Sequence, residues 1–401
     1  MILMGGGAGG YRTLDDFLPL KGRKVLLRVD INSSIINGKP EMSERMEAHA
    51  KTIKELCRKG AAVAVLAHQG RPGEKDFTSL EKHARLMRRL VKVSFVKDTM
   101  GGRALKAIKN LKPGNALLLE NVRMLREEFQ PFDGNPFISR LALFFDLFVL
   151  DALSVAHRNE ASVTGFAARL PHCMGPVMRA EVESISRLVH KTKKPYTVIF
   201  GGVKLGDYFG LFEHLMKKGG ATKVLTCGIM GELFLIARGV KLGEKEKFLE
   251  SRGLMELLPE VDKLQKAYGS RIEAPVDVAI EENGRRKVIG IGALPSERMI
   301  YDIGPKTAEM YAQIIRKSAS IFLKGVPGAF EKKGFEEGTR EVLSAIAASK
   351  GFSLIGGGES STAIGYLGIK RKRIGYVSLS GGALLKMLAG ERLPGLEAMK
   401  R

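Results

Sequence analysis

Polar and cationic side chains follow the short apolar segments in the first half of the chain. The carboxyl ends of parallel strands meet at one edge of a sheet, where ligands bind. Arginine guanidinium groups there can bind phosphate or carboxylate through paired hydrogen bonds, so the pattern predicts an anion site. The alternative is a set of scattered surface arginines in a basic protein. The polar residues that follow these segments are Asp30, Asn32, His68, Arg71, Arg123 and Arg158.

In the second half of the chain, the corresponding apolar segments end in glycine. Glycine lets backbone N–H groups approach a ligand closely, and the N-terminus of a helix binds anions. Gly356–Gly358 leads into a predicted helix that opens at Glu359, so we expect a nucleotide site on this half. The alternative is that the glycines only permit tight turns. The glycines concerned are Gly201, Gly202, Gly228, Gly325, Gly356, Gly357, Gly358, Gly381 and Gly382.

Short strands that alternate with amphipathic helices are expected to position both sets of residues, as in βαβ units with a parallel sheet. Glu44–Arg58 has apolar residues at a helical period, with Gly60 as a stop. Glu281–Ile300 is expected to form a hairpin or a loop excursion. The predicted strands are Val25–Val29, Val63–Ala67, Val93–Val96, Ala116–Leu119, Leu147–Leu150, Thr197–Phe200, Lys223–Thr226, Val276–Ile280, Ser320–Leu323, Phe352–Ile355 and Tyr376–Ser378.

The fold class expected is therefore α/β, with two similar-sized, doubly wound parallel-sheet (Rossmann-like) domains joined by a helix and a hinge. The joining helix is predicted from an apolar stripe between Gly175 and His190. The expected divisions are a flexible lead (residues 1–10), an amino-terminal domain (11–173), an interdomain helix (174–191), a carboxy-terminal domain (192–382) and a final segment returning toward the first domain (383–401).

Amino-acid composition limits the classes of binding partner and the cellular compartment that we expect. The 401 residues include 65 Lys and Arg against 43 Asp and Glu, a net charge of +22, which favours anionic partners. Three separated cysteines without a Cys-x-x-Cys pair argue against zinc or disulfides and fit a reducing, cytoplasmic location. The most apolar stretch, 141–156, is short and contains Asp146 and Asp151, so we expect no membrane span. The first ten residues lack the basic region of a signal peptide.

One half thus suits a small, multiply charged acid and the other a nucleotide. Such a pairing suggests phosphoryl transfer across a cleft whose closure expels water.

The chain also resembles the phosphoglycerate kinase family, in an archaeal form, through long motifs that occur in order from about residue 20 to near the end. These motifs are LLRVDIN (26–32), LAHQGRPGEKDFTSLEKHA (66–84), LLLENVR (117–123), AHR (156–158), FGGVK (200–204), DIGPKT (302–307), GAFE (328–331) and GGGES (356–360).

The resemblance implies reversible, Mg²⁺-dependent phosphoryl transfer between 1,3-bisphosphoglycerate with ADP and 3-phosphoglycerate with ATP, in glycolysis and gluconeogenesis. It assigns 3-phosphoglycerate to the amino-terminal domain, with Arg45 as the arginine that moves onto the transferred group. On its own, Arg45 reads as a solvated charge on the first helix. The residues implied for the acid are Asp30, Asn32, Arg45, His68, Arg71, Arg123 and Arg158.

The resemblance assigns ATP or ADP to the carboxy-terminal domain. Gly201, Gly202 and Gly228 are implied to line the adenine pocket, Glu331 to reach the ribose and Lys204 to contact phosphate. The terminal phosphates and Mg²⁺ are assigned to Gly357, Gly358, Glu359 and Ser360, with Glu359 as the metal ligand.

This sequence departs from the common family pattern mainly in the second domain. Tyr208 replaces a second lysine, and Lys324-Gly325-Val326 replaces Asn-Gly-Pro. Leu379-Ser380 replaces the start of a Thr-Gly-Gly-Gly motif, and Leu150 replaces an asparagine in the first domain. We expect Lys324 to supply the cation that Tyr208 cannot; the alternative is one more solvated lysine.

Two other functions remain open from the sequence. One is a phosphoglycerate-binding paralogue with reduced or lost kinase activity, motivated by these departures. The other is a nucleic-acid-binding protein, motivated by the charge, although the chain lacks tryptophan and an RNP-type motif. We expect no specific nucleic acid and no membrane as partners, and either a monomer or a homodimer.

Overall fold

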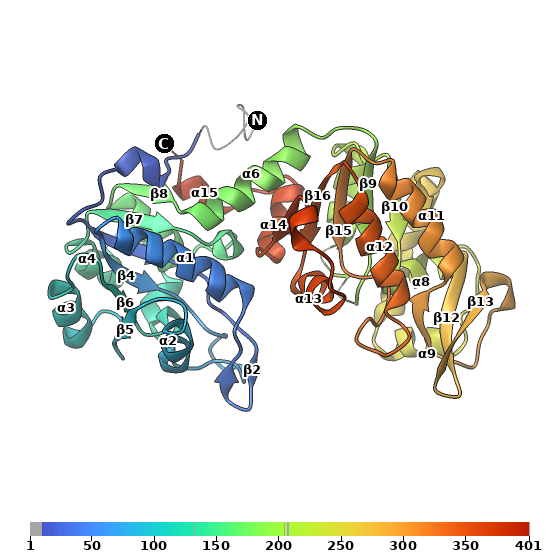
Figure 1. The fold of residues 1–401 in the computed structure, drawn as a ribbon, viewed down its shortest axis with the longest axis horizontal. Helices are drawn as coiled ribbons and strands as arrows, with labels where there is room; N and C mark the ends of the chain where they lie inside the picture. Colours follow the sequence, from blue (N-terminus) through green and yellow to red (C-terminus); the bar gives the residue numbers. More distant parts are fainter. Residues whose placement is uncertain (1–9, 133, 204, 207, 401) are drawn as a thin grey trace. The chain divides into compact units, whose positions relative to one another are not determined.

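The computed structural model describes residues 10–132, 134–203, 205–206 and 208–400. The expected flexible lead, residues 1–10, falls outside this part of the chain except for Gly10. Two compact units are present: Met1–Glu183 together with Gly382–Arg401, and Ser184–Gly381. The division falls within α6 (Pro176–His190), which is labelled in Figure 1. None of the described helices combines the length and the apolar character that crossing a membrane requires.

The first unit is built on a six-stranded sheet with the order β5-β6-β4-β1-β7-β8, in which every neighbouring pair is parallel. From β1 the chain continues to β4 on one side of the sheet and returns later to β7 on the other side. The switch point therefore lies between β1 and β7. Its strands are β1 (Lys24–Arg28), β4 (Ala62–Leu66), β5 (Val93–Phe95), β6 (Ala116–Leu118), β7 (Leu147–Leu150) and β8 (His172–Met174), with a small hairpin of β2 (Ile35–Ile36) and β3 (Lys39–Pro40).

Side chains that alternate along β1 face opposite sides of this sheet. Val25 and Leu27 share a core with α1 and α2, whereas Leu26 and Arg28 are also fully buried but lie outside that core. Burial on both faces explains why the strands read as continuous apolar runs. The helices of this unit are α1 (Glu44–Arg58), α2 (Glu81–Met87), α3 (Gly102–Lys109), α4 (Pro136–Ala142), α5 (Ala161–Thr164), α14 (Gly382–Leu388) and α15 (Pro394–Ala398).

The second unit has its own six-stranded parallel sheet, in the order β11-β10-β9-β15-β16-β17. Renumbered from β9, this order is 3-2-1-4-5-6, the doubly wound order with its switch point between β9 and β15. The prediction of two doubly wound α/β domains is therefore confirmed. The strands are β9 (Tyr196–Phe200), β10 (Lys223–Thr226), β11 (Ile272–Glu273), β15 (Ser320–Lys324), β16 (Phe352–Gly356) and β17 (Tyr376–Ser378).

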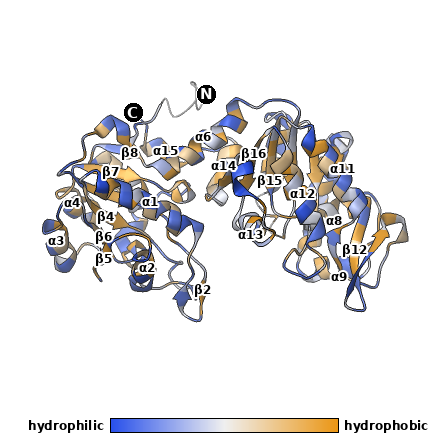
Figure 2. Ribbon diagram, in the orientation of Figure 1, coloured by the Kyte–Doolittle hydropathy of each residue, from blue (hydrophilic) through white to orange (hydrophobic). Residues whose placement is uncertain are grey.

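Helices cover both faces of the second sheet, and apolar residues concentrate in its strands (Figure 2). One face packs on α11, α12 and α13. On the other, Phe200 stacks on Phe212 at 5.3 Å between ring centroids, and Phe212 stacks on Phe234 at 5.8 Å. The helices are α7 (Tyr208–Lys217), α8 (Gly228–Ala237), α9 (Glu244–Ser251), α10 (Leu258–Tyr268), α11 (Pro305–Arg316), α12 (Glu337–Ala348) and α13 (Gly358–Tyr366).

A separate antiparallel sheet, β13-β12-β14, interrupts the second unit. The prediction that residues 276–280 form a parallel strand is wrong, because they belong mostly to β12 (Asp277–Glu282), which pairs antiparallel with β13 (Arg285–Gly290) and β14 (Ile300–Ile303). Asn283 and Gly284 both have positive φ, as a two-residue hairpin turn requires. The hairpin expected within 281–300 is thus present.

Candidate active site

Asp30 follows β1 at the switch point of the first unit, and the residue is only 2 % exposed. Its carboxylate lies 2.9 Å from Arg45 Nη1 and accepts hydrogen bonds from the Ser154 hydroxyl (2.6 Å) and the Asn32 backbone N–H (3.0 Å). Burial alone would raise the pKa of Asp30, but the charge of Arg45 and these hydrogen bonds hold it well below its ordinary value. Asp30 is therefore a fixed negative charge that orients Arg45.

Arg45 lies in the first turn of α1, where the Ser43 side chain caps the helix by accepting a hydrogen bond from the Met46 N–H at 3.3 Å. Its side chain is 29 % exposed, so the guanidinium touches both the buried Asp30 and solvent. A guanidinium offers five N–H donors in a planar fork, so it can contact more than one anion at once. The geometry therefore permits Arg45 to bind Asp30 and a second anion.

His68 is a neutral hydrogen-bond donor in this site. Burial lowers its pKa well below the usual value, and the charges of Arg28 and Arg123 lower it further, against the opposing effect of Asp30. Arg28 Nη2 lies 3.1 Å from His68 Nδ1. Because an arginine can only donate, Nδ1 must accept and the proton must be on Nε2.

Arg123 and Arg158 converge on Glu160. Arg123 is 4 % exposed; its Nη1 donates to the Gly70 carbonyl at 2.6 Å and its Nη2 to Glu160 Oε1 at 3.2 Å. Arg158 Nη1 lies 3.5 Å from the same oxygen. The structure thus brings the two arginines together at one carboxylate, although they follow different strands.

The loop after β4 joins these groups. Asn32 Oδ1 accepts the Gly70 backbone N–H at 2.8 Å, and Gly70 has a φ of +65°, with Phe77 N 2.6 Å from the position a Cβ would occupy. Glycine is therefore required at residue 70. Arg71 is exposed, and its charge adds to burial and Arg123 in lowering the pKa of Arg158. Of the predicted acid-site residues, Arg71 is the one most open to solvent.

Three buried residues that the sequence analysis did not identify form a hydrogen-bonded chain connected to this site. Arg28 is fully buried and donates through Nε to the Ser162 hydroxyl at 2.8 Å. Ser162 in turn donates from its hydroxyl (2.6 Å) and its backbone N–H (2.9 Å) to the buried Glu128 carboxylate. The only sequence signal was a charged residue inside an apolar strand, at position 28, with no indication of its partners.

Glu128 predicts a pH dependence of stability. Burial raises its pKa from 4.5 to about 7, against the opposing effects of Arg28 and Ser162. The folded state therefore holds a proton that the unfolded state has lost above pH 4.5, so this group's contribution to the free energy of unfolding falls as pH rises from about 4.5 to 7. We expect the free energy of unfolding of Glu128→Gln, measured by chemical denaturation relative to wild type, to be higher at pH 7.5 than at pH 5. An equal difference at both pH values would contradict the raised pKa.

In the second unit, glycines after β9, β10 and β15 let three loops lie against one another. A Cβ at Gly325 would lie 2.1 Å from the Gly201 carbonyl oxygen, and one at Gly228 would lie 2.9 Å from Gly202 N. A Cβ at Gly201 would lie 2.6 Å from the Val326 carbonyl oxygen. These glycines are therefore required by backbone packing at the switch point, whatever else they contact.

The N-terminus of α13 lies beside this glycine cluster. Gly357, the residue before α13, has a φ of +104°, and Gly358 has open space where a Cβ would be. Glu359 Oε2 lies 2.8 Å from the Cβ position of Gly202, which connects α13 to the end of β9. The Ser360 hydroxyl is buried and has no hydrogen-bond partner.

Lys324 ends β15, and its Nζ lies 2.8 Å from the Cβ position of Gly357. It is therefore on the same edge of the sheet as the predicted phosphate residues. Tyr208 is 4 % exposed and its ring lies 5.4 Å from that of Phe200, so a lysine at this position would be buried in the core. Glu331 is exposed on the loop after β15, and Lys204 lies outside the described residues.

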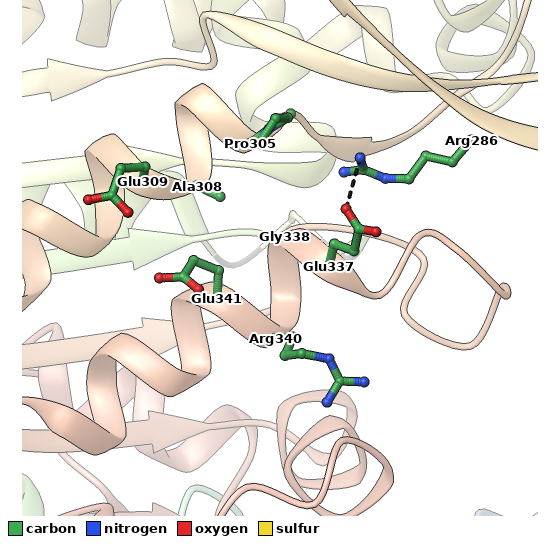
Figure 3. A pocket seen from close by; sticks show the side chains of 9 residues that line it. Arg286, Pro305, Ala308, Glu309, Glu337, Gly338, Arg340 and Glu341 are labelled. Atoms are coloured by element: carbon green, nitrogen blue, oxygen red, sulfur yellow. Dashed lines mark ion pairs between the residues drawn. The ribbon is translucent and has the colours of Figure 1, made fainter.

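A cavity of about 470 Å³ elsewhere in the second unit is lined by residues from α11, α12 and β13, none of which was predicted for a site (Figure 3). Its charges are paired within the protein: Arg286 Nη1 lies 3.0 Å from Glu337, and Arg316 bonds Glu341 and lies near Glu309. Arg340 donates to the Leu367 carbonyl oxygen. Its lining carries two arginines and three carboxylates, so, unlike the acid site, it does not concentrate positive charge.

The chain has two doubly wound domains. One carries clustered arginines at its switch point, and the other carries glycine loops and a helix N-terminus. This is the architecture of a two-domain phosphotransferase. The family model described as phosphoglycerate kinase matches residues 14–391, so the chain belongs to the phosphoglycerate kinase family.

Individual relatives agree with this assignment. The phosphoglycerate kinase of Methanopyrus kandleri is 42 % identical over 394 residues, covering 96 % of this chain and 97 % of the relative. That of Saccharolobus solfataricus is 39 % identical over 397 residues, covering 96 % of each. The crystal structure of phosphoglycerate kinase from Pyrococcus horikoshii OT3 has a TM-score of 0.89 at 34 % identity, covering 96 % of this chain and 97 % of that one. These relatives favour the kinase over the non-catalytic paralogue.

Proposed function

We propose that this protein catalyses reversible transfer of a phosphoryl group between 1,3-bisphosphoglycerate with ADP and 3-phosphoglycerate with ATP. The observation that carries the proposal is the convergence of Arg45, His68, Arg123 and Arg158 at the switch point of the first unit, in a chain of this family. A triply charged acid such as 3-phosphoglycerate needs such a set of cations and donors.

In this proposal, Arg71, Arg123 and Arg158 bind anionic groups of the acid, while Asn32 and the Nε2–H of His68 orient it. Arg45 contacts the transferred phosphoryl group from its position on Asp30. The 2.9 Å distance between Arg45 and Asp30 supports this role, because it keeps the guanidinium at the switch point before the substrate arrives.

The nucleotide is assigned to the second unit, with Gly201, Gly202 and Gly228 near the adenine and Glu331 at the ribose. Lys204, Lys324, Gly357, Gly358 and Ser360 are assigned to the phosphates. The partnerless Ser360 hydroxyl at the start of α13 supports a phosphate ligand there.

The Glu359 carboxylate, together with nucleotide phosphates, fits a magnesium ion. Among the described residues no group of three His, Cys, Asp or Glu side chains could hold a metal. Glu359 offers a carboxylate beside Gly202, and Mg²⁺ is commonly bound by one or two carboxylates together with nucleotide phosphates. Such an ion would neutralise charge on the phosphates; its ligand from the protein would be Glu359.

The chemistry needs no general base. The acceptor in the ATP-consuming direction is a carboxylate, which is ionised at neutral pH. What the protein supplies is alignment of two anions and stabilisation of the charge that develops on the moving phosphoryl group. Because the ligands are assigned to different units, transfer requires both ligands to be bound at the same time.

Calorimetric titration of the two ligands separately tests this division. We expect 3-phosphoglycerate and ADP with Mg²⁺ to bind with 1:1 stoichiometry, and Arg71→Ala to weaken binding of the acid while leaving ADP affinity within twofold. Equal loss of both affinities in Arg71→Ala would contradict the assignment of the acid to the first unit.

Lys324 gives a prediction for the nucleotide side. If its ammonium stabilises the transferred group, Lys324→Asn lowers kcat/KM by tenfold or more, equivalent to about 1.4 kcal/mol of transition-state stabilisation. Lys324→Arg keeps the charge and retains more activity, and Lys317→Asn, an exposed lysine at the end of α11, is the matched control. An unchanged kcat/KM in Lys324→Asn would show that the lysine is incidental.

A further inference from the structure

Glu160 lies where the acid site is expected to bind its ligand, and its charge is of the wrong sign for that ligand. The residue precedes α5 and is only 6 % exposed, and a single oxygen, Oε1, contacts both Arg123 (3.2 Å) and Arg158 (3.5 Å). Its backbone carbonyl accepts the N–H groups of Val163 and Thr164, so the residue is held in place independently of its side chain.

The contacts in this cluster are incomplete on both sides. Glu160 Oε2 is buried without a hydrogen-bond partner, as are Nε of Arg123 and Nε of Arg158. Charge-assisted N–H···O bonds are usually about 2.7–2.9 Å long, shorter than both contacts here. The two guanidinium groups are therefore only partly satisfied by Glu160 and retain donors for another anion.

We propose that Glu160 is an internal counter-anion that stabilises Arg123 and Arg158 in the free protein and limits their affinity for the anionic group of the substrate. This inference rests on the proposed function, because it takes a phosphate-bearing acid as the ligand of these arginines. Glu160 is a positioning residue: it acts through the two guanidinium groups and takes no part in bond making.

Electrostatics give the proposal two linked consequences. Arg123 is buried, and a buried arginine that loses its carboxylate is destabilising in the absence of another anion. A phosphate dianion that binds beside Glu160 is repelled by it, so neutralising Glu160 favours the bound state. Arg28 and Glu128 also interact electrostatically with the Arg123 guanidinium. Because burial raises the pKa of Glu128 to about 7, Glu160 is the carboxylate whose negative charge the substrate meets.

The test is Glu160→Gln, which removes the charge and keeps the shape. We expect the variant to unfold at a lower temperature than wild type without ligand, and to bind 3-phosphoglycerate more tightly by on the order of tenfold. Because tighter binding to the folded state raises stability, the increase in Tm at saturating 3-phosphoglycerate is expected to be larger in the variant than in wild type. ADP affinity is expected to remain within twofold.

Two further variants separate charge from position. Glu47→Gln removes one negative charge from an exposed site on α1 and is expected to leave 3-phosphoglycerate affinity within twofold. Glu160→Asp keeps the charge, and is expected to show no gain in affinity.

The outcomes are distinguishable from failure of the proposed function. A wild-type protein that binds no 3-phosphoglycerate would contradict the function itself. Wild-type binding with unchanged or weaker affinity in Glu160→Gln would overturn the counter-anion role, as would a tenfold gain in Glu160→Asp. A Glu160→Gln protein that stays unfolded even with 3-phosphoglycerate would also overturn it, because the substrate would then have failed to replace the carboxylate.

Discussion

Arg45→Ala is expected to lower kcat by about 10²–10³ while changing the KM for 3-phosphoglycerate much less. Loss of one preorganised donor to a developing charge typically has an effect of this size. The guanidinium is held 2.9 Å from the buried Asp30 carboxylate and is 29 % exposed, so it can reach an anion without leaving the site. Steady-state kinetics in both directions measures the effect.

Lys54→Ala is the matched control for Arg45, because Lys54 is exposed on the same helix. We expect its kcat to stay within twofold of wild type. A kcat within threefold of wild type in Arg45→Ala would contradict the assignment of this residue to the transferred group. A large rise in KM with unchanged kcat would instead make Arg45 a ground-state ligand.

Arg123→Ala is expected to affect both stability and binding. Its loss leaves the buried Glu160 carboxylate with only the longer contact to Arg158, so we expect the free energy of unfolding to fall by about 3 kcal/mol. Affinity for 3-phosphoglycerate is expected to fall by about 10² or more, because a charge-assisted pair of donors is removed. ADP affinity is expected to remain within twofold.

Chemical denaturation and calorimetry measure these effects, and Arg126→Ala provides the control, since Arg126 is exposed three residues further along the same segment. The control is expected to resemble wild type in both measurements. An Arg123→Ala protein with unchanged stability would show that Glu160 finds solvent or another partner. One with unchanged 3-phosphoglycerate affinity would remove Arg123 from the acid site.

Strands buried on both faces were the most predictable part of the fold. Val25–Val29 and Val63–Ala67 correspond to the neighbouring parallel strands β1 and β4, and their continuous apolar runs are typical of strands buried on both faces. The edge strands β8 and β11 were missed, since three and two residues carry too little pattern. Residues 276–280 were assigned to the wrong sheet because composition alone does not distinguish parallel from antiparallel partners.

The acid site was predictable in part because strand order brings strand ends together. Asp30 and His68 follow β1 and β4, adjacent strands, so their proximity follows from the sheet. Arg45 lies on a helix, and only the family resemblance marked it.

Arg28, Glu128 and Glu160 could not be predicted, because their roles depend on burial among segments that are distant in the sequence. Arg28 and Ser162, for example, are 134 residues apart and 2.8 Å apart in space. At Tyr208 the family resemblance indicated only that a lysine is absent. The packing of the Tyr208 ring on Phe200 became evident only from the fold.

A coupled assay of ADP-dependent turnover of 1,3-bisphosphoglycerate tests the proposed phosphoryl transfer most directly. We expect ATP formation that requires both ligands, is supported by Mg²⁺ and falls by about 10²–10³ in Arg45→Ala. The absence of turnover in a folded protein that still binds 3-phosphoglycerate would contradict the proposed activity and identify a binding protein instead.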